Sequence, residues 1–448
     1  MFFYRNPLKW VKNLEISASS TGDVSEDHFG HWIQPTDDGE ILFVGQINSF
    51  GYNGGTENTD SVGGSVYVFR KQGEEYEQIQ RIVAPTNDVA GEHFTFNIGS
   101  NLSGTKIVVG DASRDYDSAN GAEDYHGVIY VYESGSSGYA LVQEIQPQTV
   151  VTYGSLGMRV AMDATGTKMF ASTYENDVVN YGGSVSVYES GSSGFQYVQE
   201  LTANDPDGSP EGDWFVMPRV SRDGNTLFVG SYGDEEGADT AVGAVYVFQS
   251  GSSGYQQVQK LEPSNHLGQY EMFGYISALN EDDSIFAASA YARNHDGTVN
   301  GNYRMGTVVI YESGSNGWQE TQTIDAPVND GGVNAYNFGI DISISGSYLA
   351  IGSELDWRTA EEKDAGGSWR NKGAVYIYER VDGTYQLKHR IVQEGERNTI
   401  GYFSVERGGF GYSVELLPND ELLVGSPRDD LNGTDSGVVY KYKLTRDY

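Results

Sequence analysis

The sequence contains no cysteine, and this absence excludes both a disulfide scaffold and a thiolate metal site. Basic residues are also scarce, because 28 lysines and arginines stand against 63 aspartates and glutamates and leave a formal net charge of −35. A field of this sign repels phosphate groups, so we expect neither nucleic acid nor an anionic membrane surface as a partner. No stretch approaches the roughly 18 consecutive apolar residues that a membrane span needs, so we expect no membrane insertion.

The chain also lacks the apolar core of a secretory signal after Met1, which in such signals runs over about 7–15 residues. What it has in excess is glycine, with 58 residues, and tyrosine, with 32. Since 38% of the residues are apolar, the chain still has enough material for a core. This composition is typical of a globular protein with many turns.

An internal repeat organises the whole chain. Its marker is a glycine followed by a run rich in valine, isoleucine and tyrosine, and its seven copies begin at Gly64, Gly127, Gly183, Gly243, Gly306, Gly373 and Gly437. Successive copies lie 63, 56, 60, 63, 67 and 64 residues apart. Self-similarity at a nearly fixed period indicates a repeat architecture.

Each copy contains four short runs that favour strands, represented by Phe273–Ile276, Leu227–Gly230, Val245–Phe248 and Tyr255–Leu261. Short runs of β-branched and aromatic residues bounded by glycine, aspartate and serine are typical of strands. The third run is apolar on both faces, as expected for a strand that lies between neighbouring sheets. The motif SGSSG, seen in Tyr132–Gly138, separates the third run from the fourth. We interpret it as a hairpin turn in which glycine supplies a positive φ, and not as a flexible linker.

The two ends of the chain favour a closed ring. The seventh copy ends with its third run, at Val438–Tyr442, while Lys9–Glu15 has the pattern of a fourth run. Pairing these two segments would remove the open edges of a linear array. We therefore predict an all-β fold, a single seven-bladed β-propeller of four-stranded antiparallel blades, closed by the N-terminal strand. We assign the closing strand of blade 7 to residues 8–16 and blades 1 to 7 to residues 17–82, 83–146, 147–202, 203–262, 263–325, 326–392 and 393–448.

The order of motifs within each copy resembles the FG-GAP repeats of integrin α-subunits and of many bacterial surface proteins. The FG pair is intact at Phe29-Gly30, Phe273-Gly274, Phe338-Gly339 and Phe410-Gly411, and the GAP element is best preserved at Gly425-Ser426-Pro427. This resemblance covers nearly all of the chain and implies a propeller of the extracellular binding type. Calcium-binding members carry a D-x-[DN]-x-[DN]-G loop between the first two strands. Here that turn is three or four residues long, so the family's calcium sites are not transferred.

The long, variable segments fall between the second and third runs, on the face opposite the short turns. Variable loops on a rigid scaffold often form binding sites. Aromatic rings beside polar groups suit a surface glycan or a protein partner in a larger assembly; the alternative is that the rings only cap the blades. The ligand-binding candidates are Tyr116, Tyr125, Tyr174, Tyr181, Tyr232, Tyr291, Tyr303, Trp357, Arg358, Trp369 and Arg370.

Two clusters of oxygen-bearing side chains are candidate Ca²⁺ sites, and no other cofactor is expected. The first comprises Asp115, Asp117, Asn120 and Asp124, and the second Asp429, Asp430, Asn432 and Asp435. Carboxylate and amide oxygens are the ligands that Ca²⁺ prefers. In both clusters the glycine is out of register with the calcium-loop template, and in so acidic a chain such clusters also arise by chance.

No catalytic motif is present: there is no nucleophile elbow and no phosphate-binding loop, and His28 and His31 do not have the spacing of a helical zinc site. We therefore predict a non-enzymatic binding or structural propeller. Because no secretion signal is recognised, we expect it on a virion, as a phage tail, fibre or decoration component, or on another extracellular surface. The alternatives are a carbohydrate-active hydrolase or lyase with acids at the channel mouth, and a cytoplasmic scaffold.

Overall fold

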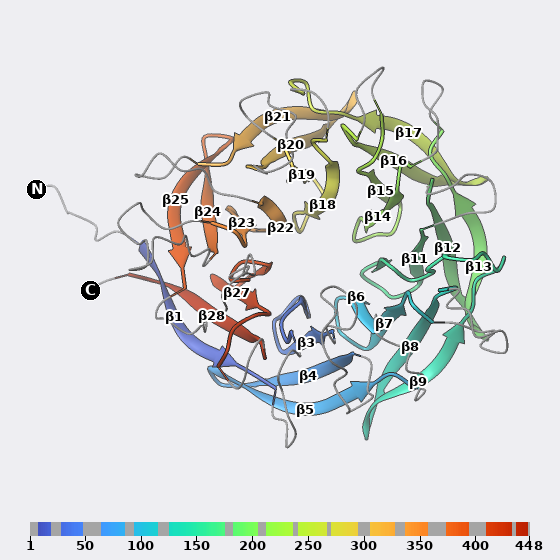
Figure 1. Cartoon of the computed structure of the whole chain (residues 1–448), viewed down its shortest axis with the longest axis horizontal. Helices are drawn as coiled ribbons and strands as arrows, with labels where there is room; N and C mark the ends of the chain where they lie inside the picture. Colours follow the sequence, from blue (N-terminus) through green and yellow to red (C-terminus); the bar gives the residue numbers. More distant parts are fainter. Residues whose placement is uncertain are drawn as a thin grey trace, which may run out of the picture.

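The computed structural model describes residues 8–18, 28–47, 64–85, 94–114, 125–174, 182–204, 212–235, 241–266, 270–293, 305–327, 337–356, 373–393, 409–431 and 436–446. These residues form 28 strands, which are grouped in seven four-stranded antiparallel sheets around a central channel (Figure 1). The predicted seven-bladed β-propeller is confirmed. Among the described residues there is no helix that could span a membrane.

In each blade the strands follow one another from the channel outward. Blade 1 consists of β2 (Trp32–Pro35), β3 (Ile41–Gln46), β4 (Ser65–Gln72) and β5 (Glu75–Val83). Blade 2 consists of β6 (Phe94–Ser100), β7 (Lys106–Asp111), β8 (Val128–Gly135) and β9 (Gly138–Ile145). Blade 3 consists of β10 (Val160–Met162), β11 (Lys168–Thr173), β12 (Ser184–Gly191) and β13 (Gly194–Leu201).

The next three blades have the same order. Blade 4 consists of β14 (Phe215–Val220), β15 (Thr226–Ser231), β16 (Ala244–Gly251) and β17 (Gly254–Leu261). Blade 5 consists of β18 (Phe273–Leu279), β19 (Ile285–Ala290), β20 (Thr307–Gly314) and β21 (Gly317–Asp325). Blade 6 consists of β22 (Phe338–Ser345), β23 (Tyr348–Ser353), β24 (Ala374–Val381) and β25 (Thr384–Val392).

Blade 7 is built from both ends of the chain. Its inner strands are β26 (Ser413–Leu417), β27 (Glu421–Ser426) and β28 (Val438–Arg446), and its outermost strand is β1 (Leu8–Ile16). β1 pairs antiparallel with β28, with a register shift between Lys12 and Leu14. The predicted closing strand is thereby confirmed. Because this pairing joins the N-terminal strand to the C-terminal strand within one blade, it closes the ring.

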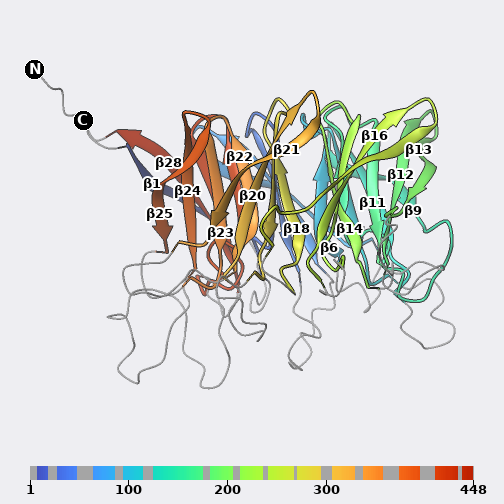
Figure 2. The same cartoon turned by 90° about the horizontal axis from the view of Figure 1, so that it is seen from above.

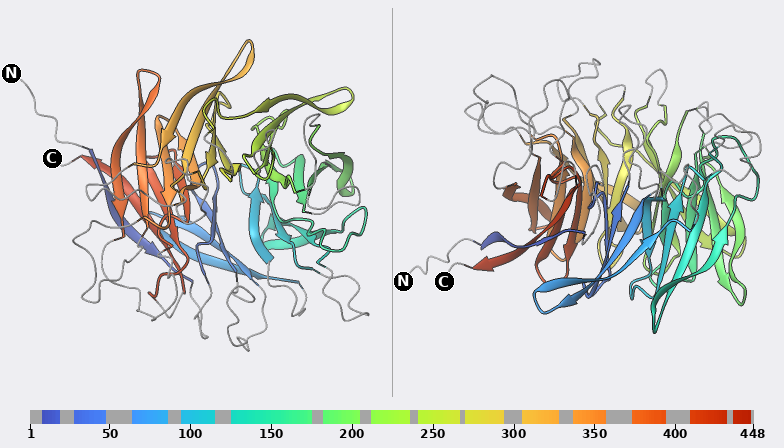
Figure 3. Two further views of the ribbon diagram at one scale, coloured as in Figure 1. Left: turned by 45° about the horizontal axis from the view of Figure 1, so that its top comes forward. Right: turned by 60° about the horizontal axis from the view of Figure 1, so that its bottom comes forward.

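The strands run between two faces of a disc (Figure 2). The turns between first and second strands and the hairpins between third and fourth strands lie at one face, which we call the short-turn face. Figure 3 shows these hairpins from two further directions. The second strands end and the third strands begin at the opposite face, which we call the long-loop face. Most of the segments proposed above as binding loops lie outside the described residues.

Blades pack through their third strands. In β16 the first five residues are buried, which confirms the prediction of a strand covered on both faces. The FG phenylalanine of the following blade supplies part of this cover, because Phe273 packs in one cluster with Val245 and Val247. The glycine after it is required by space: at Gly274, with φ of 88°, a Cβ would lie 2.6 Å from the carbonyl oxygen of Ala244.

A paired side-chain contact repeats along the outer edge of the ring. At Gln143 in β9, the amide nitrogen donates to the carbonyl of Phe195 in β13, and the amide oxygen accepts from the Phe195 N–H, both at 2.8 Å. We call this contact the glutamine bridge. It joins five successive pairs of blades, through Gln80 to Tyr139, Gln143 to Phe195, Gln199 to Tyr255, Gln259 to Trp318 and Gln322 to Tyr385.

The glutamine bridge accounts for the repeated SGSSG turn. The last glycine of the turn in blade 3, Gly194, has φ of 89°, and a Cβ there would lie 2.3 Å from the side-chain oxygen of Gln143. Gly138, Gly254 and Gly317 are in the same position relative to the glutamine of the preceding blade. The turn is a hairpin, as predicted, and its glycine leaves room for the neighbouring blade to bind.

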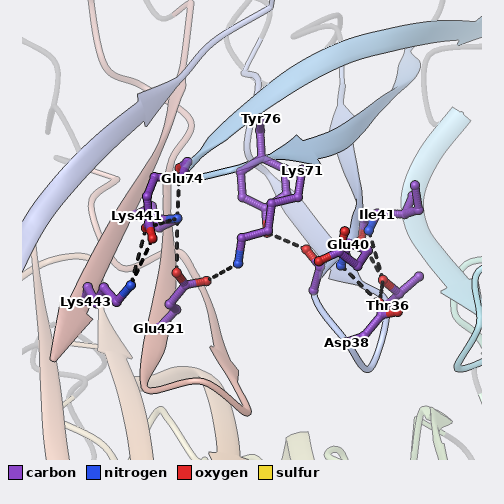
Figure 4. Close-up of polar contacts among 11 residues, drawn as sticks. Thr36, Asp38, Glu40, Ile41, Lys71, Glu74, Tyr76, Glu421, Lys441 and Lys443 are labelled. Carbon is purple, nitrogen blue, oxygen red and sulfur yellow. Dashed lines mark hydrogen bonds and ion pairs between the residues drawn. The ribbon is translucent and has the colours of Figure 1, made fainter.

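The seam between blades 7 and 1 is held by buried charges instead (Figure 4). Lys441 on β28 is fully buried, and its ammonium group lies 3.2 Å from Glu421, which also pairs with Lys71 of blade 1 at 2.8 Å. The same ammonium group donates to the carbonyl of Glu74 at 3.0 Å and lies 5.7 Å from the ring centroid of Tyr76. Two lysines and a buried carboxylate therefore join the first blade to the last.

Candidate functional site

The channel holds a cavity at the centre of the ring. It has a volume of about 250 Å³ and is surrounded by the innermost strands of the blades and by their turns at the short-turn face. Toward the long-loop face it continues into a pocket of about 20 Å³. Arg159, Trp32 and Tyr275 border both spaces. The channel therefore has two ends with different chemistry, one aromatic and one charged.

Three of the predicted tyrosines come together at the long-loop end of the channel. Tyr174, Tyr232 and Tyr291 each follow directly on the second strand of their blade, in blades 3, 4 and 5. Because these strands are equivalent, their ends lie at the same face and on neighbouring blades. Tyr291 is buried and the other two rings are half-buried.

Two further rings connect these tyrosines into a continuous group. Trp214 lies 6.5 Å from Tyr174 and 5.0 Å from Tyr232, measured between ring centroids. Tyr275 lies 5.5 Å from Tyr232 and 4.2 Å from Tyr291. We call these five residues the aromatic arc. Burial raises the pKa of the Tyr232 phenol well above its usual range, so this group stays neutral and can donate a hydrogen bond.

Sequence reasoning missed Trp214 and Tyr275, although a signal for both was present. Trp214 directly precedes the FG-equivalent Phe215, and Tyr275 directly follows the FG pair of blade 5. Trp214 directly precedes the innermost strand of its blade, and Tyr275 lies on an innermost strand and borders the channel. The same position in blade 7 is Tyr412, whose hydroxyl is 2.9 Å from Nε2 of His31.

Of the remaining predicted binding residues, the structure describes only Tyr125. Tyr125 stacks on Tyr153 with a centroid distance of 5.8 Å, and no aromatic contact joins this pair to the aromatic arc within the described residues. The other candidates lie outside the described residues: Tyr116, Tyr181, Tyr303, Trp357, Arg358, Trp369 and Arg370.

The predicted metal clusters fall mostly in segments that the structure does not describe, namely Asp115, Asp117, Asn120, Asp124, Asn432 and Asp435. Asp429 is fully buried, and its carboxylate accepts hydrogen bonds from the Tyr440 hydroxyl and the Gln393 amide. Through these contacts Asp429 joins β28 to the segment after β25, which is a structural role. Asp430 is the next residue in the chain. In the described part of the chain no group of three or more acidic or histidine side chains is arranged to hold a metal ion, and the calcium sites stay a prediction.

Two carboxyl groups project from neighbouring inner strands into the channel region. Asp341 on β22 accepts hydrogen bonds from the N–H groups of Ile342, at 3.0 Å, and Val414, at 2.7 Å. Glu415 on β26 accepts from the hydroxyl of Ser343 at 3.0 Å. Burial raises the pKa of Asp341 to about 7 and that of Glu415 to about 8, and for Glu415 the nearby Asp341 adds to the rise. Near neutral pH Glu415 is therefore largely protonated, and Asp341 is about half protonated.

The short-turn end of the channel is bordered by a ring of turns. Backbone hydrogen bonds join the turns of consecutive blades, from Asp37 to Leu102, from Leu102 to Ala164 and from Ala164 to Arg222. The Arg222 guanidinium also donates to the Asp37 carboxylate at 2.7 Å. Because two blades separate Asp37 from Arg222 on one side of the ring and three on the other, this ion pair spans the channel mouth.

No family model matches the chain, and no curated protein matches it in sequence. Solved structures match over nearly the full length. The chain is similar to the WD40 repeats of RRP9, with 10% identity, a TM-score of 0.52 and coverage of 98% of this chain and 99% of that one. It is similar to hydrazine synthase of Kuenenia stuttgartiensis, with 14% identity, a TM-score of 0.52 and coverage of 96% and 98%.

A third similar structure is the β-propeller domain of Myceliophteria thermophila Cps50 (Swd1), with 9% identity, a TM-score of 0.54 and coverage of 95% and 99%. Likeness at such low identity shows the fold alone. The class of protein is thus a seven-bladed β-propeller, and the resemblance to FG-GAP repeats stays a resemblance. Since these similar structures include both WD40 repeats and a protein named as a synthase, the fold does not decide between binding and catalysis.

Proposed function

We propose that this protein is a non-enzymatic binding propeller that receives a protein partner at the long-loop end of its channel. The observation that carries the proposal is the aromatic arc, in which five rings from three blades contact one another in sequence. Four of these rings are half-buried, so they are held in place and still reach solvent. Tyrosine and tryptophan in such positions are the residues that contribute most of the affinity in protein interfaces.

The rigidity of the aromatic arc favours binding. Each ring packs against the next. Tyr275 lies on the innermost strand β18, and Trp214 directly precedes the innermost strand β14. The ring of blades holds both strands in place. Side chains that are ordered before binding lose little conformational entropy when a partner arrives. The neutral Tyr232 hydroxyl offers a hydrogen bond beside apolar ring faces. A peptide loop with an apolar anchor and polar flanks fits this chemistry.

A carbohydrate-active enzyme is the second candidate, and the channel carboxyl groups of Asp341 and Glu415 are the observation that favours it. Glycoside hydrolysis uses two carboxyl groups, one protonated and one ionised. Such a pair needs pKa values that the environment pushes apart. Here burial raises the pKa of both groups, to about 7 and about 8, so the environment does not separate one protonated acid from one ionised acid. We therefore place binding before catalysis.

The location proposed for this propeller is the exterior of a virion or cell. The support is the formal net charge of −35, which keeps a surface solvated and repels nucleic acid. Immunogold labelling of the source organism and of the particles it releases tests this proposal. Label on particles or on the outer surface is the expected result, and label confined to the cytosol would contradict it.

The binding proposal can be tested with a random peptide library displayed on phage and selected on the full chain. We expect enriched peptides whose affinity falls at least about tenfold in Trp214→Ala and in Tyr275→Ala, the loss typical of an aromatic anchor. Tyr153→Ala, in the separate stacked pair, and Tyr197→Ala, on an outer strand, are the matched controls and should bind as wild type.

Two results would overturn the proposal. Enriched peptides that bind Trp214→Ala and wild type equally would show that the aromatic arc is not the binding surface. Release of reducing ends from polysaccharides by wild type, lost in Glu415→Gln, would establish the second candidate instead.

A further inference from the structure

The larger chamber of the channel combines apolar walls with arginine side chains. Its volume of about 250 Å³ is enough for a small organic molecule. Three arginines border it: Arg159, Arg219 and Arg222. Between them the wall includes the apolar side chains of Ile98, Val160, Met162, Met217, Ile344 and Leu416, beside polar ones such as Asn97, Ser277 and Ser343. A partly open space with this lining suits a ligand that has one anionic group and one apolar part.

Arg219 is the side chain whose donors are open to such a ligand. It lies on β14, is half-buried and borders the cavity. The guanidinium makes no hydrogen bond and has no ion-pair partner within 4 Å among the residues that the structure describes. The charges that act on it at longer range are Asp283, Asp341 and Glu415. A guanidinium group has five N–H donors, so those of Arg219 are available in the channel.

The other two arginines differ from Arg219. The Arg159 guanidinium lies 5.7 Å from the ring centroid of Trp32, and Arg222 is paired with Asp37 across the channel mouth. They add positive charge at either end of the chamber, while Arg219 remains the group with free hydrogen-bonding capacity. The two side chains of this ion pair are 32% and 44% exposed. Because exposed ion pairs are weak, the pair can open to admit a small molecule.

We propose that the channel binds a small aliphatic carboxylate, with its carboxylate group on Arg219 and its chain against the apolar side chains of the wall. This site is separate from the aromatic arc and does not depend on the proposed function. A planar carboxylate matches the two parallel donors of a guanidinium group. A monoanion suits the chamber better than a phosphate, because Asp37, Glu281 and Asp283 on its wall repel a second negative charge.

Binding at this site depends on pH through the carboxyl groups that face Arg219. These are Asp341 on β22, Glu415 on β26 and Asp283 in the turn after β18, and burial raises the pKa of each. The cation that shares the chamber wall is Arg159, and the mouth adds Arg222, Asp37 and Glu281. As pH rises through about 7 to 8, Asp341 and Glu415 ionise and compete with the ligand for Arg219. Carboxylate binding therefore weakens toward alkaline pH.

Calorimetric titration of the full chain with sodium butyrate, at constant ionic strength, tests the proposal. At pH 6.5 we expect a dissociation constant on the order of millimolar, given the few atoms of the ligand. Arg219→Gln should weaken binding at least about tenfold, since hydrogen bonds to charged groups are lost. Arg219→Lys keeps the charge without the paired donors and should give an intermediate affinity. Arg70→Gln makes the same change at an exposed arginine on β4 and should bind as wild type.

Raising the pH to 9.0 should also weaken butyrate binding at least about tenfold in wild type, and less in Glu415→Gln. Equal affinity in wild type and Arg219→Gln would overturn the proposal, and so would binding of inorganic phosphate without binding of butyrate. Arg219→Gln should retain the affinity for selected peptides, and Trp214→Ala the affinity for butyrate. The failure of one proposal is thus distinguishable from the failure of the other.

Discussion

The outer edge of the ring repeats one contact, whereas the channel wall has a different side chain in every blade. At the edge, the glutamine bridge joins five pairs of neighbouring blades with nearly the same geometry. On the wall, the position three residues after the first buried residue of each FG-like motif holds Trp32, Asn97, Arg159, Pro218, Ile276, Asp341 and Ser413. Within this chain, the same side chain joins the blades at five seams, whereas the side chains that line the channel differ in every blade.

The two seams beside blade 7 sharpen this comparison. The position of the bridging glutamine is occupied there by His389 and Leu14, and buried charges around Lys441 join blade 7 to blade 1. We infer that the outer edge serves stability and the channel serves binding. Substitutions at the edge should change the free energy of unfolding, and substitutions on the wall should change ligand affinity or pH dependence.

The largest loss of stability is expected at the closing seam. Glu421→Gln removes the carboxylate between Lys441 and Lys71 and leaves a fully buried ammonium group without its main counter-charge. Breaking a buried ion pair in this way should lower the free energy of unfolding by about 3 kcal/mol. Urea denaturation measures the change. Glu379→Gln, which breaks a half-exposed pair with Lys388, is the control and should cost less than about 1 kcal/mol. Equal costs would contradict the role given to the seam.

The channel carboxyl group Glu415 should make stability fall as pH rises. Its pKa is raised in the folded state, so this carboxyl group ionises more readily in the unfolded chain. The free energy of unfolding therefore falls as pH rises from about 4 to the folded-state pKa of about 8. Glu415→Gln removes this term. Its free energy of unfolding should match that of wild type near pH 4 and exceed it by at least about 2 kcal/mol at pH 9. Glu75→Gln, at an exposed site, is the control, and its free energy of unfolding should equal that of wild type at both pH values. If the free energy of unfolding of Glu415→Gln also equalled that of wild type at both pH values, Glu415 would not be a neutral acid in the folded protein.

The turn glycine of the outer edge should be the next most sensitive position. Gly194→Ala places a methyl group at a left-handed φ and within 2.3 Å of the Gln143 side-chain oxygen. A cost of about 2 kcal/mol is expected from the backbone conformation and the displaced glutamine together. In a Gln143→Ala background the same substitution should cost less, because the clash is gone. Strict additivity of the two substitutions would show that turn and glutamine are not coupled.

The smallest of these effects is the loss of one glutamine bridge. Gln143→Ala removes two hydrogen bonds between blades 2 and 3 and should lower the free energy of unfolding by about 1 kcal/mol. His389→Ala, at the corresponding place between blades 6 and 7, removes no bridge and should cost less. Chemical denaturation of both variants makes the comparison, and a larger cost at His389 would reverse it.

The sequence was sufficient to predict the ring but only part of the site. The period of the glycine–valine–tyrosine runs and the match between Lys9–Glu15 and the fourth strands predicted seven blades and their closure, because both depend on local pattern. Tyr174, Tyr232 and Tyr291 were found because they follow strand ends. Trp214 and Tyr275 were missed because the contacts that join them to those tyrosines cross between blades.

The channel charges could not be found in advance for a related reason. Arg219, Asp341 and Glu415 come from three different blades, and their proximity depends on the curvature of the whole ring. With 63 acidic residues in the chain, no local pattern distinguishes these two, which are half-buried at the channel. Burial, which raises the pKa of these two, is a property of the assembled ring.

The most direct test of this division between edge and channel measures peptide affinity and the free energy of unfolding side by side in Gln143→Ala and Trp214→Ala. We predict that Gln143→Ala is less stable but binds the selected peptides as wild type does. For Trp214→Ala we predict at least about a tenfold loss of affinity. Unchanged peptide affinity in Trp214→Ala, or lost affinity in a folded Gln143→Ala protein, would contradict the assignment of binding to the channel and stability to the edge.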